Sequence, residues 1–114
     1  MSQRIKKVNE LLKQEVSKLL LKEVDFGNVF VTITNVDTSP NLQQSKIKIS
    51  VIPTEKREEV LSAIKRNIFH IQKALNKKLY MRPVPKIIFE VDKIEEKAQR
   101  IEEILGKIKN KSVL

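Results

Sequence analysis

Hydrophobic residues near the start of the chain recur every three or four positions, which is the spacing of one face of an α-helix. From residue 2 to about residue 23 this stripe consists of Ile5, Val8, Leu12, Val16 and Leu19. The sequence DFGN at residues 25–28 supplies a glycine where such a helix should end. The pattern therefore predicts an amphipathic helix over residues 2–23.

Two segments with β-strand character follow. Residues 29–36, VFVTITNV, are rich in β-branched side chains, and apolar and polar residues alternate over residues 46–52, KIKISVI. Such alternation is typical of a strand with one face on the core and the other in water. Because a polar turn joins the two segments, we expect them to form an antiparallel pair.

The longest helical pattern runs from residue 55 to residue 79. Its apolar positions, again three or four apart, are Val60, Leu61, Ile64, Ile68, Ile71, Leu75 and Leu79. The sequence RPVP at residues 82–85 stops this pattern, because proline has no amide hydrogen and disfavours helical conformation in the residue before it. A third strand is predicted over residues 86–91, and a last amphipathic helix over residues 93 to about 109.

These elements predict an α+β fold with two layers. A right-handed crossover through the long helical segment would lay the third strand parallel to the second. We therefore expect a single domain over residues 1–109, with a three-stranded mixed sheet and its helices on one face. Residues 110–114 are expected to form a short flexible tail.

The charge of the chain narrows the choice of partners. Its 114 residues include 23 Lys and Arg against 14 Asp and Glu, a formal charge of +9. This excess favours polyanions, and nucleic acid, an anionic membrane and an acidic protein all qualify. No segment has the roughly 18 apolar residues of a membrane span, so no membrane-spanning segment is predicted. We also expect no membrane partner. The absence of cysteine suits a cytoplasmic location.

Much of the positive charge falls in and just after the long helical segment. Residues 61–89 contain seven basic residues and no acid. A solvated basic face is common in soluble proteins, but the acid-free run favours phosphate binding. The residues predicted to bind RNA are Lys65, Arg66, Asn67, His70, Lys73, Asn76, Lys77, Lys78 and Arg82.

Catalytic chemistry has little support in the sequence. His70 is the only histidine and there is no cysteine, so neither a cysteine–histidine pair nor a His/Cys metal cluster can form. There is also no glycine-rich phosphate loop. We therefore predict no catalytic residue, no cofactor, no metal and no small-molecule substrate. Among the aromatic residues, Phe89 alternates with core residues. Only Tyr80, next to the end of the basic helix, is an attractive candidate for stacking on RNA, and capping the edge of the core is an equally good interpretation of it.

The order of the segments resembles that of the ribosome-binding factor A family over roughly residues 4–105. The resemblance rests on the sequences RIKKVNELLKQEVSKLL, VTITNVDTSPNLQQSKIKISVI and LYMRPVPKIIFEVD. It implies a type II KH-like fold and a non-catalytic assembly factor. Such a factor binds the small ribosomal subunit and its ribosomal RNA late in maturation, with roles in ribosomal RNA processing and growth in the cold. The alternative is a basic module that docks on an acidic protein; in either case we expect a monomer.

One departure from the family concerns the long helical segment. The family usually carries an Ala-x-Gly motif that kinks this segment, which implies the element order α-β-β-α-kink-α-β-α. Counting back from Val84-Pro85, the motif falls on residues 67–69, where the chain has Asn-Ile-Phe. Without glycine, either Asn67 supplies the irregular backbone or the helix bends less than in relatives.

Overall fold

The structure, a computed structural model, describes residues 3–24 and 26–94. Its elements are α1 (Gln3–Glu23), β1 (Phe30–Thr38), β2 (Gln44–Ile52), the 3-10 turn η1 (Thr54–Lys56), α2 (Arg57–Lys78) and β3 (Lys86–Val91). The predicted order is confirmed as far as β3. Of the predicted last helix, only Lys93 and Ile94 are described, and they are helical. The rest of that helix and the predicted tail lie outside the described residues.

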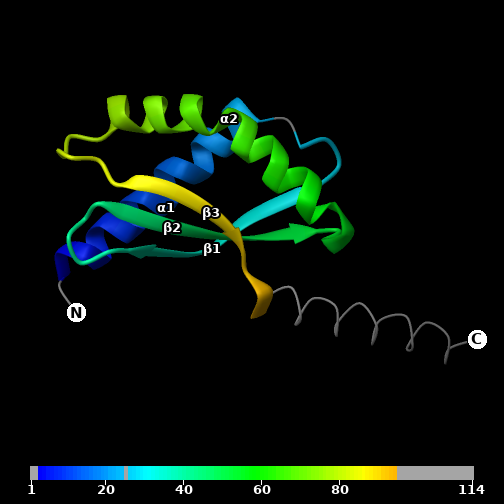
Figure 1. Ribbon diagram of the computed structural model, residues 1–114, viewed down its shortest axis with the longest axis horizontal. Coiled ribbons are helices and arrows are strands. Elements are labelled where there is room, and N and C mark those ends of the chain that lie inside the picture. Colours follow the sequence, from blue (N-terminus) through cyan, green and yellow to red (C-terminus); the bar gives the residue numbers. More distant parts are fainter. Residues whose placement is uncertain (1–2, 25, 95–114) are drawn as a thin grey trace, which may run out of the picture.

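The sheet has β2 at its centre, antiparallel to β1 and parallel to β3. This is the predicted mixed topology. Helices α1 and α2 pack against each other and cover the same face of the sheet (Figure 1). Fully buried side chains of the core come from both helices and from the parallel strands β2 and β3. They include Leu12, Val16, Ile47, Ile49, Ile64, Ile71, Leu75 and Ile87.

Strand β1 contains a bulge that changes which residues face the core. Ile33 lies opposite Ile49 and Val36 lies opposite Ile47, with a register shift between Ile33 and Asn35. Both Ile33 and Val36 are buried although they are three positions apart, whereas a regular strand returns to the same face every second residue. The extra residue in this interval allows β1 to contribute Val36 to the core.

A residue of the bulge region in β1 is hydrogen-bonded to the residue that follows β3. Thr34 donates a hydrogen bond from Oγ1 to Oδ2 of Asp92, at 2.7 Å. The second carboxylate oxygen of Asp92 accepts a hydrogen bond from the backbone N–H of Ile94, at 3.1 Å, as the side chain of a helix N-cap residue does. The pair therefore links β1 to the point where the chain leaves the sheet.

Helix α2 is continuous, and its two halves run in different directions (Figure 1). The expected pair of helices joined by a kink is therefore one bent helix. Leu42 is the only described residue other than glycine with a positive φ, so Asn67 keeps a helical backbone. Its side-chain Nδ2 donates to the backbone oxygen of Ala63, at 2.8 Å. A side chain that bonds to the helix's own carbonyl is a recognised cause of bending, and here it lies at mid-helix.

Gln72 joins α2 to the free edge of β3. Its Oε1 accepts the backbone N–H of Ile87 at 2.9 Å, and its Nε2 donates to the backbone oxygen of Pro85 at 3.1 Å. Both backbone groups point away from β2, where an edge strand has no partner strand. The amide of Gln72 thus pairs with β3 as a neighbouring strand would.

We predict that Gln72→Ala lowers the free energy of unfolding by about 1–3 kcal/mol, because it leaves two partly buried backbone groups without this partner. Urea denaturation followed by circular dichroism measures the change. Asn76→Ala is the matched control, since Asn76 is an exposed amide one turn further along the same helix, and its effect should stay within about 0.5 kcal/mol. Equal denaturation midpoints for the two variants would contradict this role of Gln72.

Candidate nucleic-acid interface

Five basic or titratable side chains lie on the solvent side of α2. We call them the basic face: Lys65, Arg66, His70, Lys73 and Lys77, all of which are exposed. The opposite side of the helix buries Ile64, Ile71 and Leu75 completely. Within the described part of the chain, the lysines and the arginine of the basic face form no ion pair. Their charges are therefore available to an external anion.

Helix electrostatics explain only part of this arrangement. A helix favours acids in its first turn and bases in its last turn, and α2 has Glu58 and Glu59 at its start and Lys77 and Lys78 at its end. This effect fades beyond the terminal turns. It therefore does not explain a cationic cluster at mid-helix, Lys65, Arg66 and Lys73.

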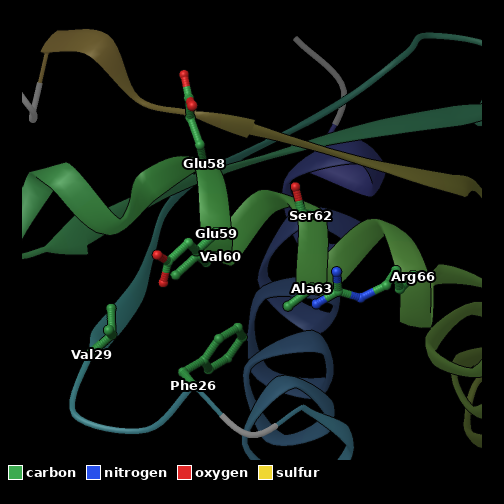
Figure 2. Close-up of a pocket in the computed structure, with 8 residues that line it drawn as sticks. All are labelled: Phe26, Val29, Glu58, Glu59, Val60, Ser62, Ala63 and Arg66. Atoms are coloured by element: carbon green, nitrogen blue, oxygen red, sulfur yellow. The ribbon is translucent and has the colours of Figure 1, made fainter.

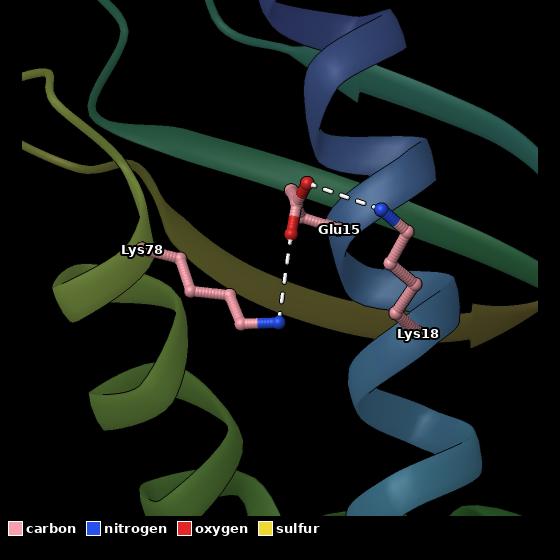
Figure 3. A network of polar contacts seen from close by, with 3 residues as sticks. All are labelled: Glu15, Lys18 and Lys78. Atoms are coloured by element: carbon pink, nitrogen blue, oxygen red, sulfur yellow. Dashed lines mark ion pairs between the residues drawn. The ribbon is translucent and has the colours of Figure 1, made fainter.

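Two of the residues predicted to bind RNA instead contact other groups of the chain. Lys78 lies on the side of α2 that faces α1, where its Nζ is 3.7 Å from Oε2 of Glu15 (Figure 3). The other oxygen of Glu15, Oε1, is 3.7 Å from Nζ of Lys18. Arg82 donates from Nη1 to the backbone oxygens of Leu79 and Met81, at 3.1 and 2.7 Å. The structure therefore does not bring Lys78 and Arg82 into the basic face.

The two asparagines that were predicted to bind RNA also form hydrogen bonds within the chain. Asn67 is half-buried and bonds to Ala63, and Asn76 accepts a hydrogen bond from Gln72 at 3.0 Å. Asn76 remains exposed on the helix. The amide of Asn67 thus shapes the helix beneath the basic face, and that of Asn76 lies at its border.

Phe69 is the residue of this surface that the sequence reasoning missed. Its side chain is 71% exposed, and it lies one helical turn from both Lys65 and Lys73. Its ring meets that of His70 edge to face, with centroids 5.9 Å apart. The signal was present in the sequence, because position 69 falls between Ile68 and Ile71 but off their apolar stripe. Tyr80 is fully exposed beyond the end of the helix.

A shallow pocket of about 560 Å³ borders the basic face at the start of α2. Phe26 and Val29 line it from the loop before β1, and Val60 and Ala63 from the helix. Figure 2 shows the Arg66 side chain folded back along α2 toward Ala63, at the rim of this pocket. Glu58 and Glu59 also line the pocket. Because these acids repel phosphate, the basic face does not extend past Arg66 into the pocket.

Other kinds of site find no support in the described residues. Among residues 3–24 and 26–94, no three His, Asp or Glu side chains gather in a way that could hold a metal ion. No helix in the same ranges is long and apolar enough to cross a membrane. What the surface offers chemically is a row of cations, unpaired with any described acid, around one exposed aromatic ring.

The fold and the surface together define a small α+β protein with a helical face suited to a polyanion. Residues 4–105 match the family model described as ribosome-binding factor A, so the chain belongs to the ribosome-binding factor A family. The ribosome-binding factor A of Halothermothrix orenii is 33% identical over 109 residues, which cover 94% of this chain and 89% of that protein. That of Clostridium botulinum strain Loch Maree is 34% identical, over 93% of this chain and 92% of that protein.

Solved structures agree on the fold. The crystal structure of ribosome-binding factor A from Thermus thermophilus superposes with a TM-score of 0.67 at 18% identity, over 76% of this chain and 93% of that one. A second Thermus thermophilus structure of this factor, a homology model, was fitted into an electron cryo-microscopy map of a complex with the 30S subunit. It gives a TM-score of 0.59 at 20% identity, over 72% of this chain and 88% of that one.

Proposed function

We propose that this chain is a non-catalytic assembly factor that binds the small ribosomal subunit and its ribosomal RNA in the cytoplasm. The basic face of α2 is the contact surface. The chain acts late in subunit maturation, in ribosomal RNA processing and in adaptation to cold. The observation that carries the proposal is the mid-helix cluster of exposed cations, which neither an ion pair among the described residues nor the helix dipole explains.

Two further observations support this function. The chain belongs to a family named for ribosome binding, and a Thermus thermophilus relative of the same fold has been fitted into a map of its complex with the 30S subunit. The formal charge of +9 is also suited to RNA, because cationic side chains that neutralise phosphates release counterions. Affinity from this source falls with salt and carries little sequence information.

Crosslinking to precursor small subunits tests the proposal directly. A photoreactive amino acid is placed at position 70, within the basic face, and the crosslinked RNA positions are read by reverse transcription. We expect crosslinks to ribosomal RNA in purified precursor small subunits, and weaker crosslinks in mature ribosomes. The same group at position 46, on the open face of the sheet, is the control. Crosslinks to ribosomal proteins alone would point instead to docking on a protein.

A comparison of two adjacent lysines tests the limits of the basic face. Lys77 is exposed and forms no ion pair with any described residue, whereas Lys78 pairs with Glu15. We expect Lys77→Gln to weaken binding to the small subunit severalfold and to reduce the dependence of log Kd on log salt by about 0.7–0.9. Lys78→Gln should change neither quantity appreciably. Equal losses would show that Lys78 leaves Glu15 to contact RNA and that it belongs to the RNA-binding surface.

A further inference from the structure

Phe69 stands out because of its position among cations. A phenylalanine left in water forgoes roughly 1.5–3 kcal/mol of burial, and single exposed apolar residues are common on protein surfaces. Phe69, however, is surrounded on the helix by Lys65, Arg66 and Lys73, three or four positions away on either side. Its apolar ring therefore lies within reach of three positive charges and next to the ring of His70.

We propose that Phe69 is a stacking site for one unpaired base of single-stranded RNA, with the phosphates on either side of that base held by Lys65 and Lys73. The proposal rests on the proposed function, since it assigns a ligand group to the same surface. Every base has an aromatic face, so stacking adds affinity without selecting a sequence. The adjoining lysines supply the electrostatic attraction that a nucleotide also needs.

Two other exposed aromatic residues lack this setting. Phe30 is 75% exposed, but it lies on β1 opposite Ile52, another exposed apolar residue, on the open face of the sheet. Tyr80 is fully exposed beyond the end of α2, but the cations beside it are held within the chain, Lys78 by Glu15 and Arg82 by backbone oxygens. Phe69 alone among these three combines an exposed ring with neighbouring cations that form no ion pair among the described residues.

The test uses the full chain and two probes, a ten-nucleotide single-stranded RNA and inorganic polyphosphate of similar length, which has charge but no bases. We expect Phe69→Ala to weaken binding of the RNA about tenfold, or about 1.4 kcal/mol, with an unchanged salt dependence. Its affinity for polyphosphate should not change. Phe30→Ala is the matched control, because it removes an equally exposed ring from the other side of the molecule.

A tryptophan at the same position gives an independent measurement. The chain contains no tryptophan, so Phe69→Trp creates a single fluorescent reporter. We expect this variant to keep its affinity for the RNA, and we expect the RNA to quench its emission while polyphosphate does not. Unquenched emission at saturating RNA would overturn the stacking site.

The remaining outcomes separate this inference from the proposed function. If Phe69→Ala binds RNA normally while Lys65→Glu with Lys73→Glu does not, stacking is refuted and the basic face stands. If the lysine variant also binds normally, the basic face itself is wrong. If Phe69→Ala binds the RNA probe normally but binds small subunits weakly, its ring contacts a ribosomal protein, and the stacking site is again refuted.

Discussion

Reversing three charges of the basic face, by Arg66→Glu, Lys73→Glu and Lys77→Glu together, is expected to weaken binding to the small ribosomal subunit by at least about 100-fold. Each substitution removes one cation and adds one anion, so the formal charge falls from +9 to +3. A 100-fold loss of affinity corresponds to about 2.8 kcal/mol of binding free energy. The lost phosphate contacts and the new repulsion together account for a loss of this size. Co-sedimentation with purified subunits at several salt concentrations measures it.

The control for this variant keeps the overall charge the same. Lys22, Lys86 and Lys93 are exposed lysines outside the basic face, and their reversal to Glu also brings the chain to +3. If net charge alone drives binding, both triple variants lose affinity equally, and the basic face has no special role. Circular dichroism checks that both variants fold, as expected for changes confined to exposed side chains.

The second large effect concerns the other side of the same helix. Ile71 is fully buried, so Ile71→Ala is expected to lower the free energy of unfolding by about 2–5 kcal/mol through lost burial and the cavity left behind. That is a large part of the roughly 5–15 kcal/mol that stabilises a typical domain. Urea denaturation provides the measurement.

His70→Ala is the matched control for Ile71→Ala, because the two residues are adjacent in α2 but only Ile71 is buried in the core. His70 is exposed, and its loss should change stability by no more than about 0.5 kcal/mol. A destabilisation by His70→Ala as large as that by Ile71→Ala would contradict the burial of Ile71, and not His70, in the core.

The sequence predicted the fold well because each element follows a simple period. The alternation of Ile47 and Ile49 with lysines identified β2, and the spacing of Ile64, Ile71 and Leu75 identified the inward side of α2. The bulge in β1 could not be predicted in this way. Val36 reaches the core only because an extra residue interrupts the alternation, and the choice depends on packing against Ile47 in the neighbouring strand.

The candidate site was predicted less completely than the fold. Helical spacing placed Arg66, His70, Lys73 and Lys77 on one exposed side, as the structure does. Lys78 and Arg82 belong to the same acid-free segment, yet they are held by Glu15 and by backbone oxygens. Such partners are distant in the sequence or depend on how the chain turns after the helix, so composition and spacing do not reveal them.

The sequence by itself determined which of the described residues form helices and strands and which side of α2 carries the charge, because these properties follow from local periodicity and side-chain chemistry. Tertiary structure alone decided which of the described polar side chains form contacts within the chain. Glu15 of α1 holds Lys78, and β3 holds Gln72 through Pro85 and Ile87. These contacts join segments far apart in the chain, so only folding brings together the atoms that decide them.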